Sequence, residues 1–236
     1  MERRALNTIG NIKGVLFDLD NTLYDRDQTF AQCASGFVEE HFATLSEEIR
    51  AGILQQIRTE GIKGYSARTA VFAEITAQSL TLPQDIVCAS DLFFRQWLTH
   101  MVLEEDTHRL LKRLKDEDIP FGIITNGGPK QHLKIDHLGL RTVTKCIFVS
   151  DEFGCRKPDP VIFRAAASCL NVPCEEILFA GDNPAADIGG AHAVGMTTAW
   201  LHRGIDWPVE ITDVQPDFRI ASLADLLTIL SLTEGD

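Results

Sequence analysis

Short apolar runs alternate with amphipathic segments along most of this 236-residue chain. The runs are continuously apolar over a few residues, which is typical of strands that a parallel sheet buries on both faces. They predict strands at residues 13–19, 120–125, 145–150, 177–181, 197–201 and 217–220.

Helical segments separate the later strands. The spacing of apolar residues predicts helices at 107–115, 161–170, 185–194 and 223–230, and Asp159-Pro160 suits an N-cap followed by a proline at the first helical position. Strands and helices in this alternation form a parallel sheet with right-handed crossovers and helices on both faces. We therefore predict an α/β fold, in which ligands bind at the carboxyl ends of the strands.

Residues 23–105 show helical periodicity without a convincing strand. The pattern predicts helices at 27–42, 66–80 and 85–101, and Thr44-Leu45-Ser46-Glu47 resembles a capping box that opens a further helix through Arg58. We therefore expect a core domain at 1–22 and 106–236, with an all-helical domain at 23–105 inserted as a lid.

The composition of the chain argues against several classes of binding partner. The net charge of −12 argues against nucleic acid polymers and anionic membranes, both of which favour basic surfaces. The six cysteines form no CxxC pair, which makes a cysteine-ligated zinc site a poor hypothesis. Because no secretory segment or transmembrane run is present, we expect reduced thiols and a cytoplasmic protein.

The first polar cluster, Asp18-Leu19-Asp20-Asn21-Thr22, directly follows an apolar run. An Asp18 carboxylate at a strand end can attack phosphorus, and Asp20 can then protonate the leaving alcohol and later deprotonate water. The Asp20 carbonyl can bind a metal, and Thr22 can fix the loop. The alternative is that the cluster only forms a turn.

Two further clusters carry groups suited to phosphate. The Thr125 hydroxyl and the N–H groups of Asn126 and Gly127 can cradle phosphate oxygens, although this segment can equally be a simple turn. Lys157 precedes Pro158 and a helix start, so its ammonium can hold the nucleophile and the phosphate together. A solvated surface lysine is the alternative.

The last cluster supplies more carboxylates. Asp182 follows a strand and, with Asp18 and the Asp20 carbonyl, makes an oxygen set that favours Mg²⁺. Asp187 can bind a metal-held water or orient Lys157, or it can be a helix cap. Because one lysine among these carboxylates would leave a site that repels phosphate, the pattern predicts a magnesium-dependent phosphatase.

These clusters resemble, in order, the four motifs of the haloacid dehalogenase-like hydrolases. The segments that carry the resemblance are Phe17 to Leu23, Ile123 to Gly127, Lys157-Pro158 and Gly181 to Ile188. It implies a Rossmann-like three-layer core, a helical C1-type cap, Mg²⁺, and a small phosphate monoester as substrate. It implies these roles: Asp18 as nucleophile and metal ligand; Asp20 as acid/base and metal ligand; Thr125, Asn126, Gly127 and Lys157 on the phosphate; Asp182 on the metal; Asp187, Asn183 and Thr22 around them.

Several alternatives stay open within this resemblance. The segment Phe148 to Gly154 resembles the branch that contains nucleoside-monophosphate and acylneuraminate-phosphate phosphatases, which implies a nucleoside monophosphate or a sugar phosphate as substrate. Asp20 argues against a 2-haloacid dehalogenase and a phosphonate-cleaving enzyme, whereas a sugar phosphomutase would use the same core residues. A non-catalytic binding protein is disfavoured because every motif position is intact, and either a monomer or a homodimer is compatible with the sequence.

The inserted helices are expected to contact the leaving group. Charged and aromatic residues there suggest tests of specificity: Lys63, Tyr65, Arg68, Arg95 and Trp97. We expect Arg68 and Arg95 to lie on solvated helix faces and Trp97 to pack in the interior of this domain.

Overall fold

The computed structural model describes residues 11–63, 65–79, 82 and 85–232. The chain divides into two compact units, one formed by Met1–Tyr24 with Leu103–Asp236 and the other by Asp25–Val102. We call them the core unit and the helical unit. No helix among the described residues is both long enough and apolar enough to span a membrane.

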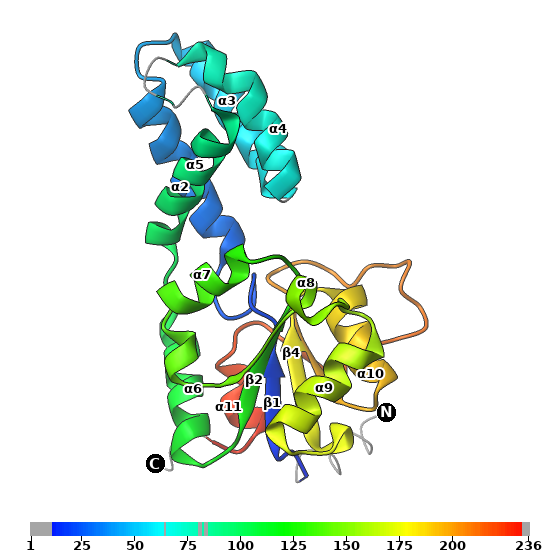
Figure 1. Cartoon of the computed structure of the whole chain (residues 1–236). Coiled ribbons are helices and arrows are strands. Elements are labelled where there is room, and N and C mark those ends of the chain that lie inside the picture. The colour runs from blue at the N-terminus through cyan, green and yellow to red at the C-terminus, as the bar shows by residue number, and fades with distance from the viewer. Residues whose placement is uncertain (1–10, 64, 80–81, 83–84, 233–236) are drawn as a thin grey trace. The chain divides into compact units, whose positions relative to one another are not determined.

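The core unit is built on a parallel sheet, which confirms the predicted α/β fold (Figure 1). All neighbouring strands are parallel, in the order β3-β2-β1-β4-β5-β6. The strands are β1 (Gly14–Phe17), β2 (Phe121–Thr125), β3 (Cys146–Val149), β4 (Ile177–Gly181), β5 (Thr197–Leu201) and β6 (Phe218–Ile220). β1, β2, β4 and β5 are buried throughout, as their continuous apolar runs predict.

Helices cover both faces of this sheet. α9 packs on β2 and β3 while α10 packs on β5, and α11 lies on the opposite side in Figure 1. The helices of the core unit are α6 (Glu105–Asp116), α7 (Lys130–His137), α8 (Ser150–Phe153), α9 (Pro160–Leu170), α10 (Gly190–Ala193) and α11 (Asp225–Ile229). Phe163 of α9 meets Phe179 of β4 edge to face, with 5.2 Å between ring centroids, at the centre of the apolar core.

The helices of the core unit differ from the prediction in two ways. The single helix predicted at 185–194 is a π-helical turn, Pro184–Gly189, followed by α10. Neither α7 nor α8 is among the predicted helices, because α7 has few apolar residues and α8 is only four residues long. Short 3₁₀ turns at Leu140–Thr142 and Cys174–Glu176 complete the connections.

The strand order positions the functional residues. From β1 the chain builds the sheet outward through β2 and β3, and then returns to the other side of β1 with β4. In sheets with such a reversal, ligands bind outside the carboxyl ends of the strands beside it, which here are β1, β2 and β4. Asp18, Thr125 and Asp182 lie at these three strand ends.

Over its described residues the helical unit contains four α-helices with an aromatic interior. They are α2 (Arg26–His41), α3 (Glu47–Thr59), α4 (Tyr65–Ile75) and α5 (Ile86–His100), with 3₁₀ turns at Gly61–Lys63 and Thr76–Gln78. Phe37 packs edge to face on Phe72 and Phe93, at 5.5 and 5.1 Å between centroids. This aromatic cluster gives the unit its own apolar core.

The structure of the helical unit can be compared with the predictions made for its capping residue and for its charged and aromatic side chains. The N-cap of α3 is Ser46, whose hydroxyl accepts from the Ile49 N–H, so Thr44 does not cap this helix as the predicted capping box requires. Trp97 is buried as expected. The expectation of a solvated Arg68 is wrong, because its side chain is buried with the guanidinium 5.6 Å from the centroid of the Trp97 ring. Lys63 and Arg95 are exposed, and the Tyr65 side chain lies outside the described part of the chain.

Candidate active site

Asp18 stands where β1 ends. Its N–H donates to the Ala180 carbonyl at 2.9 Å, which extends the pairing of β1 with β4 and fixes the direction of the side chain. The carboxylate is buried, and it accepts a hydrogen bond from Lys157 Nζ at Oδ1, at 2.6 Å, and one from the Thr22 hydroxyl at Oδ2, at 3.3 Å. A carboxylate held at both oxygens is pre-organised for attack in one direction.

Lys157 is buried between two carboxylates. Its Nζ lies 2.6 Å from Asp18 Oδ1 and 2.6 Å from Asp187 Oδ1. The Asn126 side chain fixes the lysine backbone, since Oδ1 accepts from the Lys157 N–H and Nδ2 donates to the Lys157 carbonyl, both at 2.9 Å. Burial alone would lower the pKa of Lys157, but the two carboxylates outweigh it, so the pKa is raised and the ammonium stays charged.

Asp187 is held in place by the turn that contains it. Its Oδ2 accepts from the Asn183 N–H at 2.9 Å, while its Oδ1 faces Lys157. The alternative that Asp187 caps a helix is wrong, because the Asn183 side chain does so by accepting from the N–H groups of Ala185 and Ala186. The sequence predicts Asn183 near the site but does not predict that it caps this turn.

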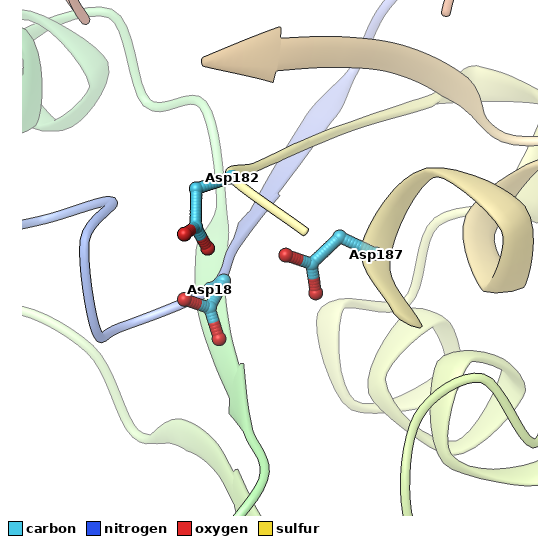
Figure 2. A group of neighbouring side chains, drawn as sticks. All are labelled: Asp18, Asp182 and Asp187. Atoms are coloured by element: carbon cyan, nitrogen blue, oxygen red, sulfur yellow. The ribbon is translucent and has the colours of Figure 1, made fainter. Parts of the chain in front are cut away.

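Asp18, Asp182 and Asp187 bring their carboxylates together (Figure 2). One oxygen of each lies within 4.8 Å of the others. With Lys157 as their close cation, the group carries a formal excess of two negative charges. A hard divalent cation with oxygen preference would offset this charge, so the donor set fits the magnesium that the sequence predicts.

The electrostatics of the cluster agree with this fit. Burial raises the pKa of Asp18 to about 8; the Lys157 ammonium opposes the rise, and the carboxylates of Asp187 and Asp182 add to it. Burial and the Asp187 carboxylate likewise raise the pKa of Asp182 to about 7, against the effect of Lys157. The cluster therefore favours binding positive charge, either as protons or as a cation.

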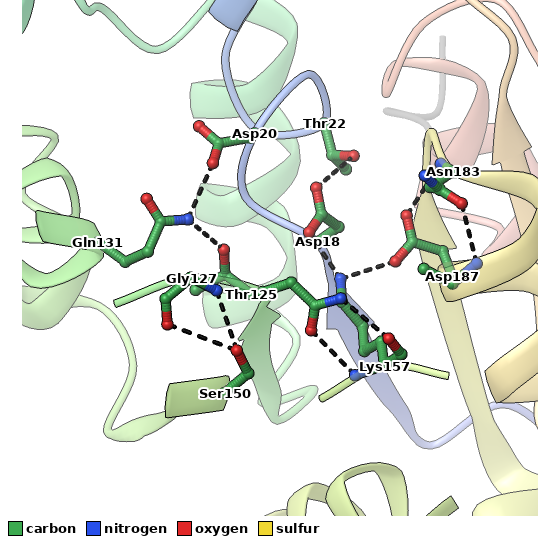
Figure 3. Close-up of polar contacts among 12 residues, drawn as sticks. Asp18, Asp20, Thr22, Thr125, Gly127, Gln131, Ser150, Lys157, Asn183 and Asp187 are labelled. Atoms are coloured by element: carbon green, nitrogen blue, oxygen red, sulfur yellow. Dashed lines mark hydrogen bonds and ion pairs between the residues drawn. The ribbon is translucent and has the colours of Figure 1, made fainter. Parts of the chain in front are cut away.

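The carboxyl end of β2 supplies the predicted phosphate residues. Thr125 is buried, and its hydroxyl accepts from Gln131 Nε2 at 2.5 Å (Figure 3). The Gly127 N–H donates to the Ser150 hydroxyl at 3.0 Å, a bond that competes with the phosphate contact predicted for Gly127. Among the described contacts, the Thr125 hydroxyl accepts a hydrogen bond but donates none, and the Asn126 N–H meets no acceptor. Of the groups predicted to bind phosphate at this strand end, these two are the most available donors.

Asp20 has partners that the sequence analysis missed. Lys134 Nζ lies 2.7 Å from its Oδ1 and 3.0 Å from its Oδ2, and Gln131 Nε2 donates to Oδ2 at 2.8 Å. Both partners lie on α7, the helix absent from the prediction. The sequence did carry a signal for α7, because parallel strands need a crossover, usually helical, and Gly139 stands where a glycine often ends a helix. In the structure Gly139 has φ of 69°, as such glycines do.

The chain is similar to known proteins over most of its length. Residues 12–195 match the family model described as haloacid dehalogenase-like hydrolase. A glyceraldehyde 3-phosphate phosphatase of Pyrococcus furiosus is 30% identical over 95% of each chain, and a phosphoserine phosphatase of Thermus thermophilus is 28% identical over 83% of this chain and 82% of that one. The crystal structure of a HAD phosphatase from Thermococcus onnurineus superposes with a TM-score of 0.64 at 26% identity, covering 93% of this chain and 98% of the other.

Proposed function

The chain belongs to the haloacid dehalogenase-like hydrolases and is a phosphatase, and from this premise we propose that it hydrolyses a small phosphate monoester through an aspartyl-phosphate on Asp18. One observation carries the proposal: a buried strand-end carboxylate paired with Lys157 at 2.6 Å, beside two further carboxylates. This arrangement suits attack on a phosphoryl group whose charge must be offset during the reaction.

In the first displacement an Asp18 carboxylate oxygen forms a bond to phosphorus while the bond from phosphorus to the ester oxygen breaks. Asp20 gives its proton to the departing alcohol. In the second displacement Asp20 takes a proton from water, whose oxygen attacks phosphorus, and inorganic phosphate leaves with Asp18 restored. Lys157 and Thr125 bind the phosphoryl oxygens, and Asp187 with Thr22 holds Lys157 and Asp18 in place.

Mg²⁺ belongs to this proposal as a cofactor. The carboxylates of Asp18 and Asp182 and the Asp20 carbonyl would hold it. When bound, it would offset the negative charge shared by the carboxylates and the phosphate. The support is the excess of carboxylates over ammonium groups at the strand ends.

The substrate class is proposed from the relatives. Glyceraldehyde 3-phosphate and phosphoserine, named for two of them, are both small alkyl phosphate monoesters. We extend that class to this chain, with sugar phosphates and nucleoside monophosphates as further members to test. We also assign the helical unit as the cap, because the chain leaves the core unit at Tyr24, four positions after Asp20.

The test is release of phosphate from a panel of esters: glyceraldehyde 3-phosphate, phosphoserine, a hexose 6-phosphate and a nucleoside 5′-monophosphate. Wild type should release phosphate with Mg²⁺ and stop with EDTA. Asp18→Asn should lower turnover at least about 100-fold, as loss of a nucleophile does, while Asp206→Asn at an exposed position should behave as wild type. Substantial turnover by folded Asp18→Asn would refute the nucleophile, and retention of a sugar bisphosphate without phosphate release would indicate a mutase.

A further inference from the structure

Among the described contacts, side chains of Lys134, Gln131 and Tyr24 in the core unit hold the carboxylate of Asp20. Lys134 Nζ contacts both of its oxygens, at 2.7 and 3.0 Å. Gln131 Nε2 donates to Oδ2 at 2.8 Å, and the Tyr24 hydroxyl donates to Oδ1. Donors on both oxygens fix the plane of this carboxylate as well as its position.

Gln131 joins Asp20 to the end of β2. Its single Nε2 donates both to Asp20 and to the Thr125 hydroxyl, so the amide lies between them in Figure 3. Its side chain fills the space that a Cβ on residue 127 would need, since such an atom would lie 2.8 Å from Gln131 Cγ. The spacing between Asp20 and Thr125 is therefore set by a closely packed, buried group.

Lys134 is buried, with 7% of its side chain exposed. Removing an ammonium from water costs several kcal/mol unless a charged partner compensates for it. Here Asp20 is such a partner, and Lys134 approaches it from the same helix as Gln131, three residues along. One helix, α7, thus places a charge and an amide on one carboxylate.

We propose that Lys134 and Gln131 are positioning residues that hold the Asp20 carboxyl in the orientation needed for proton transfer to the leaving group. This inference rests on the proposed function and deepens it. Lys134 takes no part in bond making or breaking; it acts through Asp20. The orientation of Asp20 relative to Thr125, and hence to a bound phosphoryl group, is what α7 controls.

If Lys134 acts through Asp20, the effect of losing Lys134 on the rate of hydrolysis should depend on the leaving group of the ester. An alkoxide leaves slowly without a proton, so hydrolysis of an alkyl ester needs a correctly oriented acid. A dinitrophenolate leaves readily without protonation and therefore does not depend on that orientation. Loss of Lys134 should harm the first reaction far more than the second, whereas general damage to the site would harm both equally.

The experiment compares kcat/KM for two substrates, because this quantity reports the first displacement. The substrates are the alkyl phosphate that wild type hydrolyses fastest and 2,4-dinitrophenyl phosphate. Lys134→Met should lower kcat/KM for the alkyl ester about 100-fold, the lower end of the usual acid–base effect, and for the dinitrophenyl ester less than about fivefold. Lys134→Arg restores a cation, whose guanidinium can donate to both oxygens of one carboxylate, and should recover at least a tenth of the wild-type value with the alkyl ester.

Lys112→Met is the matched control, because Lys112 is an exposed helical lysine paired with Asp116. It should leave both substrates unchanged. If Lys134→Met fails to fold, Tyr24→Phe removes a single donor to Asp20 and should still reduce the ratio of alkyl to dinitrophenyl kcat/KM severalfold. Equal losses on both substrates, or an unchanged ratio in the folded variants, would overturn the inference while the proposed function stands. A wild type that hydrolyses no ester would overturn both.

Discussion

Gly181 illustrates how one residue without a side chain allows the site to form. A Cβ at this position would lie 2.4 Å from Asp187 Oδ2, far inside van der Waals contact. The glycine at the end of β4 therefore lets the Asp187 carboxylate approach the strand and reach Lys157. The same motif that suggests Asp187 from sequence also contains the residue that makes room for it.

Gly181→Ala should consequently displace Asp187 and weaken its contact with Lys157. We expect the free energy of unfolding to fall by about 1–3 kcal/mol, the usual effect of overpacking, and kcat/KM to fall at least about tenfold as Lys157 loses its support. Chemical denaturation and steady-state kinetics measure the two effects. Gly52→Ala is the control: a Cβ there meets no neighbouring atom, so the α3 helix should gain about 0.5–1 kcal/mol. Equal stability of the two variants would refute the steric argument.

At the scale of elements, the sequence predicted the strands well and the turns poorly. β4 and β5 begin and end at the predicted residues, because a continuous apolar run has one natural place in a parallel sheet. The sequence predicts that Asp18, Lys157 and Asp187 share a site because their motifs lie close to such runs, and the structure brings these three side chains together. Gln131 and Lys134 were missed, since a polar helix gives little periodicity and a long-range ion pair leaves no local trace.

The start of α9 provides a prediction at this scale. Asp159 Oδ1 accepts from the Val161 N–H at 2.9 Å, and α9 packs directly on β2 and β3. Asp159→Ala should lower the free energy of unfolding by about 1 kcal/mol, the usual cost of losing an N-cap. Asp159→Asn, which keeps an acceptor oxygen, should cost a few tenths of that amount. Denaturant titration decides, and an Asn variant as unstable as the Ala variant would contradict the capping role.

At the scale of the whole molecule, charge connects the site to stability. The chain carries a net charge of −12, and its core unit gathers three carboxylates beside Lys157, two of them buried (Asp18 and Asp187) and one half-buried (Asp182). A cation that binds this group in the folded state stabilises folding by mass action. Binding of the proposed Mg²⁺ should therefore raise the unfolding temperature as well as support catalysis.

Asp182→Asn tests that link without any substrate. At 100 times its dissociation constant, Mg²⁺ should stabilise wild type by about 2.7 kcal/mol, visible as a higher unfolding temperature. The variant should lose this response, and its metal-free form should be at least as stable as wild type because one repelling carboxylate is gone. Asp206→Asn should respond to Mg²⁺ as wild type does. A full magnesium response in Asp182→Asn would show that the ligand is wrongly assigned.

The central claim is the aspartyl-phosphate on Asp18, and chemical trapping tests it most directly. Asp20→Asn should still react with 2,4-dinitrophenyl phosphate, which needs no acid, but should hydrolyse the intermediate slowly because it lacks the base. After quenching, borohydride converts an aspartyl-phosphate into homoserine, which peptide mass spectrometry locates. The account predicts homoserine at position 18, and none in a double variant that also carries Asp18→Asn. Dinitrophenol release with no homoserine at position 18, or with the label at another residue, would contradict it.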